Sequence, residues 1–151
     1  MPSRPQVFRS RPQRTRAELD VGYDAQRGTA RERGYGARWD KVSAGFKRAH
    51  PLCLGCEAIG QVRATDVTDH VVPHKGDMVV FWNSEQWQPA CAWHHDVIKQ
   101  QLEGMFAKGK VAVADLWLNS AAAIRLTLEL IDRPGLGGWQ NSAPEGSGPA
   151  D

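Results

Sequence analysis

The first periodic stretch of the chain spans residues 36–49. Its apolar side chains recur three or four positions apart, as they do on one face of an α-helix. These side chains are Trp39, Val42, Phe46 and Ala49. The spacing predicts a helix over this range, and Pro51 ends it because proline interrupts helical hydrogen bonding.

A different pattern follows. Residues 64–72, ATDVTDHVV, are rich in β-branched side chains, and they predict a strand that ends at Pro73. Residues 74–86 indicate a loop that contains a short apolar stretch. Residues 87–90, WQPA, predict a second strand that can only be very short. The middle of the chain is therefore expected to contribute two short strands.

Two more helices are predicted after these strands. The first runs from Ala92 to about Ala107, where Gly109 breaks the pattern. The second runs over residues 115–131 and stops at the sequence DRPG. Its expected apolar face consists of Leu116, Ala123, Ile124, Leu128 and Ile131. Short strands set among helices predict an α+β fold.

The length of 151 residues suits one domain with tails. Residues 1–33 are rich in Arg, Pro and Gly without apolar periodicity, so we expect a disordered basic arm. Residues 34–132 form the predicted domain, and residues 133–151 a flexible tail. No long apolar run indicates a membrane span, and no apolar signal segment is visible at the N-terminus, so a cytoplasmic protein is expected.

The formal net charge of +2 does not indicate a class of partner, but the charged residues are unevenly distributed along the chain. The first 16 residues hold five arginines and no acid. Such an arm can bind the DNA backbone through the release of counterions. It can equally be an inert tail, and both interpretations stay open.

The three cysteines all fall within one metal-ligand pattern. Cys53-x-x-Cys56 is followed, after 34 residues, by Cys91-x-x-His94. Two such pairs can enclose one tetrahedral zinc ion, which would stabilise the fold. His95 competes with His94 as the fourth ligand, but the spacing favours His94. The alternative is that the cysteines are small buried residues without a metal.

A second group combines Asp69 and His70 with His95 at the start of the predicted helix. Asp69 and His95 make a two-residue ligand set for a divalent ion, and His70 is then available as a general base for water. Adjacent strand residues point to opposite faces. Asp69 and His70 can therefore share a site only at a strand end or a bulge, which Pro73 favours. The alternative is a buried Asp–His hydrogen bond that stabilises the fold.

At this point the sequence resembles a known family. Residues 33–103 resemble the HNH endonucleases of phages and prophages, which are often encoded near terminase genes. The matching pieces are RGYGARWDKV, HPLCLGC, ATDVTDHVVPHKGD, FWNSEQWQPAC and HHDVIKQQLE. The resemblance implies a small ββα-metal (HNH) core stapled by a zinc knuckle site, with flanking helices.

The resemblance also implies roles. Asp69 and His95 would hold a catalytic divalent ion (Mg²⁺, Mn²⁺, Ni²⁺ or Zn²⁺), and His70 would be the general base. Cys53, Cys56, Cys91 and His94 would hold structural Zn²⁺. DNA would be the substrate, phage terminase a partner, and the cytoplasm of a bacterial host the location, with no membrane involved. The products would carry 5′-phosphate and 3′-hydroxyl ends.

The chain departs from the family pattern at two positions. His94 replaces the last cysteine of the second knuckle, which is conservative for zinc. Gln86 stands where the family has the asparagine that pins the loop between the two strands, while the nearby Asn83 is out of register. We take Gln86 as the substitute catalytic-site residue.

Three further residues are predicted to contact nucleic acid: His74, Lys99 and Arg38. For His74 and Lys99, solvated side chains are the alternative. Two hypotheses follow from the whole sequence. The first is a metal-dependent endonuclease that nicks or cuts DNA. The second is a catalytically weakened, zinc-stapled module that binds DNA or assists packaging, and Gln86 is the feature that favours it.

Overall fold

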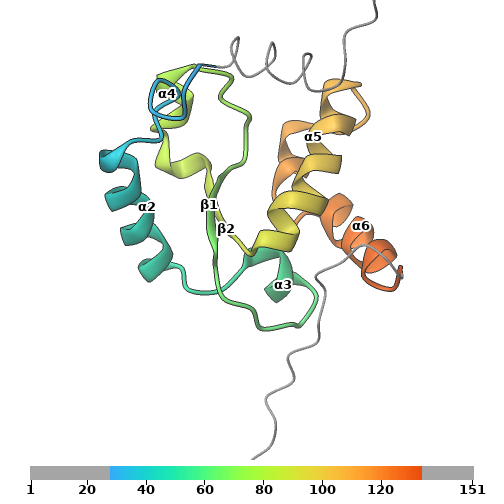
Figure 1. Cartoon of the computed structure of the whole chain (residues 1–151). Helices are drawn as coiled ribbons and strands as arrows, with labels where there is room; N and C mark the ends of the chain where they lie inside the picture. Colours follow the sequence, from blue (N-terminus) through green and yellow to red (C-terminus); the bar gives the residue numbers. More distant parts are fainter. Residues whose placement is uncertain (1–27, 134–151) are drawn as a thin grey trace, which may run out of the picture.

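The computed structural model describes residues 28–133 (Figure 1). Within this range a two-stranded sheet is combined with helices, so the predicted α+β class is confirmed. Residues 1–27 of the predicted arm and the predicted tail from residue 134 onward lie outside the described residues. Residues 28–33, also assigned to the arm, lead into a turn in which the Tyr35 N–H donates to the Ala30 carbonyl at 2.9 Å.

Helix α2, Ala37–Ala49, forms where the apolar spacing predicts it. Trp39 and Ser43 lie on its buried face. The Ser43 hydroxyl is 2.8 Å from the Thr68 hydroxyl, in a buried hydrogen bond that joins the helix to the sheet. Helix α2 is therefore attached to the strand that carries Asp69 and His70.

The sheet consists of β1, Val67–His70, and β2, Trp87–Ala90, which pair antiparallel. In this register Asp69 lies opposite Gln88, and His70 lies opposite Trp87. Both predicted strands are present, and β1 is shorter than the range 64–72. Since the sheet has two strands in the described part of the chain, one edge of β1 is not paired with another strand there.

Two short helices form the connection between the strands, where the sequence indicates a loop. They are α4, Met78–Phe81, and the 3-10 helix η1, Ser84–Gln86. The Asp77 carboxylate caps α4 by accepting from the Val79 N–H at 2.9 Å. The Asn83 side chain caps η1 by accepting from the Glu85 N–H at 3.2 Å. The connection is thus held by side-chain caps at both of its turns.

The first cysteine pair lies at helix α3, Leu54–Ala58. The helix predicted from residue 92 is present as a π-helical segment η2, His94–Lys99, that continues into α5, Gln100–Ala107. A π-helical stretch widens the turn and changes which side chains share a face. Here it contains the two adjacent histidines, His94 and His95.

The continuous helix predicted over 115–131 is wrong. A 3-10 helix η3, Val113–Leu116, precedes α6, Ala121–Ile131. The break arises because Ser120 caps α6, its hydroxyl accepting from the Ala123 N–H at 3.1 Å. The predicted apolar face is also corrected at Leu128, which is 53% exposed, while Thr127 and Leu130 are buried.

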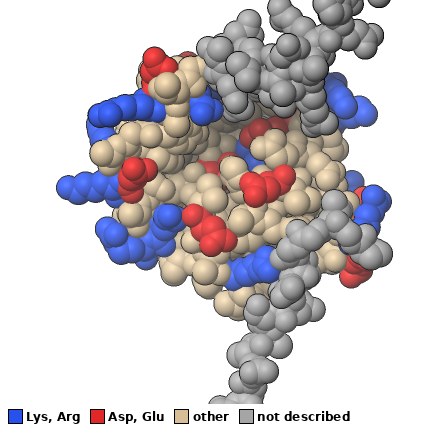
Figure 2. All heavy atoms as spheres, in the orientation of Figure 1, with Lys and Arg blue, Asp and Glu red and all other residues tan. Residues whose placement is uncertain are grey.

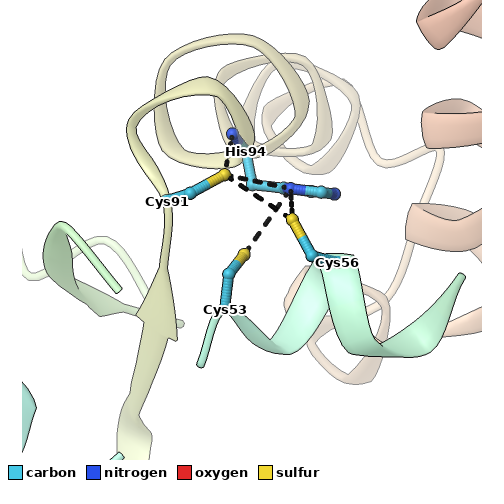
Figure 3. A group of neighbouring side chains, drawn as sticks. All are labelled: Cys53, Cys56, Cys91 and His94. Atoms are coloured by element: carbon cyan, nitrogen blue, oxygen red, sulfur yellow. Dashed lines mark hydrogen bonds between the residues drawn. The ribbon is translucent and has the colours of Figure 1, made fainter. Parts of the chain in front are cut away.

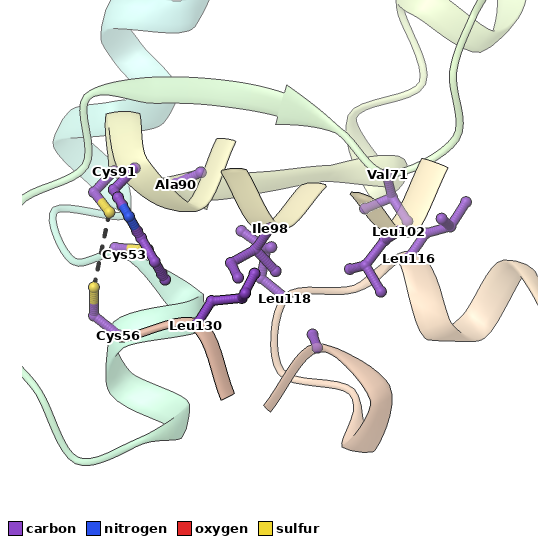
Figure 4. Packing of buried hydrophobic residues seen from close by; sticks show 12 residues of the cluster. Cys53, Cys56, Val71, Ala90, Cys91, Ile98, Leu102, Leu116, Leu118 and Leu130 are labelled. Atoms are coloured by element: carbon purple, nitrogen blue, oxygen red, sulfur yellow. Dashed lines mark hydrogen bonds between the residues drawn. The ribbon is translucent and has the colours of Figure 1, made fainter. Parts of the chain in front are cut away.

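The core has two parts. A larger cluster contains the three cysteines and aliphatic residues such as Ile98, Leu102, Leu116 and Leu118 (Figure 4). A smaller aromatic cluster consists of Trp39, Phe81 and Trp87, on the α2 and α4 side of the molecule (Figure 1). Among residues 28–133, no helix has the length and apolar character needed to cross a bilayer.

Candidate functional site

Four potential metal ligands meet between α3 and the start of η2. Cys53, Cys56, Cys91 and His94 are all buried, and their ligand atoms lie within 4.8 Å of one another. Figure 3 shows the three sulfurs and the imidazole ring pointing toward a common centre. The group can therefore bind a structural metal such as zinc, and His94 rather than His95 is its fourth member.

The distances within this group match a tetrahedral ion. With Zn–S bonds of about 2.3 Å and Zn–N bonds of about 2.0–2.1 Å, a tetrahedron has S···S edges of about 3.8 Å and S···N edges of about 3.5 Å. The Cys56 and Cys91 sulfurs are 3.8 Å apart. The His94 Nδ1 lies 3.6 Å from the Cys53 sulfur and 3.4 Å from each of the other two.

The surroundings fix the orientation of the His94 ring. The Thr127 hydroxyl donates to the Ala123 carbonyl at 2.8 Å, so its oxygen accepts from His94 Nε2–H at 3.3 Å. Nδ1 then carries the lone pair that faces the sulfurs. Partners of this kind hold metal-binding histidines in one tautomer. On the other side, a Cβ at Gly55 would lie 2.6 Å from His94 Nε2, so only glycine leaves room for the ring.

Binding of a metal here is coupled to proton release. Hydrogen bonding with Cys53 lowers the pKa of Cys91 and raises that of Cys56. Burial lowers the pKa of His94, but hydrogen bonds to Cys53 and Cys91 together with their charges raise it to about 9. A metal ion must displace the protons on these groups, so its affinity falls as the pH falls.

A cleft of about 820 Å³ lies over β1, between the α2 side and the η2–α5 side of the molecule. Asp69, His70 and His95 all line it, together with His74 and Glu103. His70 is the last residue of β1, which is the strand end that the sequence analysis requires. The face drawn in Figure 2 is hollowed near its centre, where acidic side chains gather, and most of the Lys and Arg side chains lie toward its periphery.

The Asp69 carboxylate is 5% exposed and held from one side. Gln88 Nε2 donates to Asp69 Oδ2 at 2.8 Å, and Lys99 Nζ lies 3.5 Å from the same oxygen. The Gln88 amide is itself fixed, because it also donates to the Leu116 carbonyl and accepts from the Leu118 N–H. Burial raises the pKa of Asp69, and the charge of Lys99 opposes that rise.

The other oxygen, Asp69 Oδ1, faces His95 Nε2 at a distance of 3.8 Å. This distance is too long for a direct hydrogen bond between Asp69 and His95. His95 Nδ1 lies 2.8 Å from Asp96 Oδ1, so Nδ1–H donates there and Nε2 is left with its lone pair toward Asp69. Two electron-pair donors at this separation can be bridged by a divalent ion with bonds of about 2.0–2.2 Å. The residues present thus fit a two-residue ligand set.

The His70 imidazole is oriented by the loop between the strands. Its Nε2 lies 3.0 Å from the Phe81 carbonyl, which also accepts from the Trp87 indole N–H at 3.0 Å. Because a carbonyl only accepts, His70 Nε2 carries the proton and Nδ1 has a lone pair. The ring stacks on Trp39 with centroids 5.0 Å apart. Burial lowers the pKa of His70 to about 4, so the ring is neutral at pH 7.

His74 also lines the cleft, but both of its ring nitrogens have partners. The Gly76 N–H donates to Nδ1 at 3.1 Å, and Nε2 lies 3.0 Å from the Tyr35 hydroxyl. Burial, with a smaller effect of the Arg33 charge, lowers the pKa of His74. His74 is thus placed in the cleft as a neutral, hydrogen-bonded ring.

The other predicted contacts lie elsewhere. Lys99 is 1% exposed and donates to the His70 carbonyl at 2.8 Å and to Glu103 at 2.5 Å. The structure corrects its predicted phosphate contact, because the ammonium is enclosed beneath the cleft. Arg38 is exposed on α2 and stacks over Trp82 at 4.4 Å from the ring centroid, outside the residues that line the cleft.

Gln86 lies at the end of η1, where its backbone carbonyl accepts from the Val71 N–H at 2.8 Å. In the described part of the chain, the side-chain amide that bonds the backbone of this loop is that of Asn83. The loop between the strands is thus held by the Asn83 cap and by the Phe81 carbonyl, which contacts both His70 and Trp87.

Sequence reasoning missed several residues around these sites. Gln88 and Thr127 could have been suspected, because each is a polar residue among apolar neighbours of a strand or helix face. Arg33 and Tyr35 both line the cleft. The predicted domain boundary at residue 34 assigns Arg33 to the disordered arm and Tyr35 to the domain. Nothing in the local sequence distinguishes Glu103 from other helix acids.

Comparisons with known proteins find no match for this chain among family models, curated proteins or solved structures.

Proposed function

We propose that this protein is a metal-dependent endonuclease of the HNH type that hydrolyses DNA phosphodiester bonds. The observation that carries the proposal is the convergence of Asp69, His70 and His95 on one cleft. The order of elements supports it as well, since β1, β2 and the helix that begins at η2 follow one another as a ββα-metal core requires.

His70 is suited to act as the general base. Its Nε2–H is engaged by the Phe81 carbonyl, so Nδ1 is the atom that can take a proton from water. With a pKa of about 4, the ring is unprotonated at neutral pH. The stacked Trp39 ring restricts the orientation of the His70 ring, which lines the cleft.

Asp69 and His95 would hold the catalytic divalent ion, Mg²⁺, Mn²⁺, Ni²⁺ or Zn²⁺. When bound, such an ion supplies positive charge to the phosphate and to the leaving 3′-oxygen. Gln88 holds the second carboxylate oxygen, which leaves Asp69 one oxygen for this task. The Cys53, Cys56, Cys91 and His94 group would hold structural zinc and fix the start of the segment that carries His95.

The choice of DNA as substrate rests on the family resemblance, as do the 5′-phosphate product ends, phage terminase as a partner and a bacterial host cytoplasm as the location. A catalytically weakened module that binds DNA is the rival. The presence of an oriented base and a fitting ligand pair in one cleft favours the enzyme.

The test is nicking of supercoiled plasmid by the zinc-loaded protein with added Mg²⁺, Mn²⁺, Ni²⁺ or Co²⁺. We expect cleavage with at least one metal and a loss of about 10²–10⁴-fold in His70→Ala, the usual contribution of a general base. His50→Ala is the matched control, because His50 is an exposed histidine that does not line the cleft. DNA binding without cleavage by any metal would support the rival and refute the proposal.

A further inference from the structure

The charged residues of the cleft are not evenly spread. On the η2–α5 side, the carboxylates of Asp69 and Glu103 share the buried Lys99 ammonium. Two cations also line the cleft: Arg33, in the turn before α2, and Lys75, in the connection between β1 and α4. A negatively charged substrate in this cleft therefore has Arg33 and Lys75 available as positive side chains, besides the proposed metal ligands.

Arg33 differs from the three predicted nucleic-acid contacts, His74, Lys99 and Arg38, because each of those side chains already has a partner. The Arg33 Nε is shielded from solvent and has no hydrogen-bond partner. Within residues 28–133, Arg33 forms no ion pair. The adjacent acid, Glu32, is engaged by Thr29, whose N–H and hydroxyl donate to its carboxylate at 2.6 and 2.9 Å. A half-buried guanidinium with an unsatisfied N–H is suited to an anion that enters the cleft.

The backbone holds Arg33 in place. Its N–H donates to the Thr29 carbonyl at 3.1 Å. Gly34 follows with φ of +93°, and a Cβ there would lie 3.1 Å from the Phe81 ring. The turn is thus packed against the same residue whose carbonyl orients His70. The turn that carries Arg33 and the proposed general base therefore both contact Phe81, the first at its ring and the second at its carbonyl.

The neighbouring cleft residues are less suited to hold a phosphate. His74 has partners on both ring nitrogens. Lys75 is exposed at positive φ of 46° on the loop. Lysine also presents a point charge, whereas the guanidinium fork matches two oxygens of one phosphate.

We propose that Arg33 binds the non-bridging oxygens of the scissile phosphodiester and is a substrate-binding residue of this cleft. This inference rests on the proposed function and names the residue that would neutralise the substrate's charge, besides the ion proposed at Asp69 and His95. Arg38, which lies outside the cleft, would not contact the scissile phosphate.

Two probes test this with zinc-loaded full-length protein. The first is bis(p-nitrophenyl) phosphate, a small diester that offers only the phosphate at the reacting centre. We expect Arg33→Ala to lower kcat/KM for this diester about ten- to hundredfold, as loss of a charged hydrogen bond implies. Arg33→Lys should retain part of the rate, and added guanidinium should restore part of it in Arg33→Ala. Arg125→Ala, on the exposed face of α6, is the matched control and should leave the rate unchanged.

The second probe is binding of a labelled DNA duplex in the His70→Ala background, which separates binding from cleavage. Arg33→Ala should weaken binding and reduce the slope of log K against log salt by about one, the value for one phosphate contact. Zinc content and melting temperature are measured for every variant to detect a folding defect. If Arg33→Ala has such a defect, Arg33→Gln is used in its place.

The outcomes distinguish the two proposals. If the wild type hydrolyses neither the diester nor DNA with any metal, the proposed function fails. The duplex-binding measurement then still tests whether Arg33 contacts phosphate. If the wild type is active and Arg33→Ala behaves like Arg125→Ala with both probes, the inference is overturned. An equal loss of diester hydrolysis in Arg38→Ala would place the phosphate outside the cleft and overturn it too.

Discussion

Replacing Gly55 by alanine tests the geometry of the metal group through one methyl group. The new Cβ would lie 2.6 Å from His94 Nε2, well inside contact distance. His94 cannot simply turn away, because its ring is held by Thr127 and faces three sulfurs. Either α3 or the ring must shift, and both carry metal ligands. Gly55→Ala should therefore weaken zinc binding as well as stability.

The magnitude follows from two opposing effects. Alanine in place of glycine within a helix stabilises it by about 0.5–1 kcal/mol. Overpacking of a buried site destabilises by about 1–3 kcal/mol, before any loss of a metal ligand is counted. The net effect is destabilising, and for a domain of this size about 1 kcal/mol corresponds to about 4–8 °C in melting temperature.

Gly104→Ala is the matched control, since Gly104 lies in α5 with nothing within 4 Å of its added Cβ. Thermal melting and release of zinc to a chromophoric chelator give the assay. We expect Gly104→Ala to melt at or above the wild-type temperature with full zinc, and Gly55→Ala to melt several degrees lower with faster zinc release. If Gly55→Ala matched Gly104→Ala in both measurements, the placement of His94 beside α3 would be refuted.

Three further predictions concern the groups behind the two sites. Thr127→Val removes the acceptor of His94 Nε2–H, and competition with a chelator should show zinc affinity about 10–100-fold lower; unchanged affinity would contradict the tautomer assigned here. Gln88→Met leaves Asp69 Oδ2 without its amide donor, so the cleavage rate should fall while the zinc content stays at one ion per chain. A wild-type cleavage rate in this variant would refute the role of Gln88 in positioning Asp69. Burial lowers the pKa of His70 to about 4, and a general base acts when it is unprotonated. The cleavage rate at saturating metal should therefore stay level from pH 8 to about 5 and decline only near 4. A pH–rate profile with its midpoint near 6.5 would rule out this buried base.

Features that depend on local spacing could be predicted from the sequence. The apolar repeat locates α2, and the two x-x pairs bring Cys53, Cys56, Cys91 and His94 together. The helix and each x-x pair are local patterns, and the ligand chemistry that the two pairs share links them across the 34 residues between them. The two short strands are likewise marked by Pro73 and by residue composition.

Features that depend on contacts between residues far apart in the sequence could not be predicted. Lys99 has the spacing of a surface lysine four residues after His95, but packing against β1 encloses it between Asp69 and Glu103. The partner of Asp69 is Gln88, and only the register of the two strands places them opposite each other. On α6, Thr127 rather than Leu128 lies on the buried face, and its hydroxyl is 3.3 Å from His94 Nε2, a contact between residues 33 positions apart.

The most direct test of the proposed active site is a time course of cleavage of an end-labelled DNA duplex by zinc-loaded wild-type protein and His70→Ala at saturating divalent metal. We predict metal-dependent cleavage by the wild type that leaves ligatable 5′-phosphate and 3′-hydroxyl ends, with the His70→Ala rate reduced at least about a hundredfold at unchanged zinc content. Equal rates for the two proteins, or no wild-type cleavage with any of the metals, would contradict the assignment of Asp69, His70 and His95 as a nuclease site.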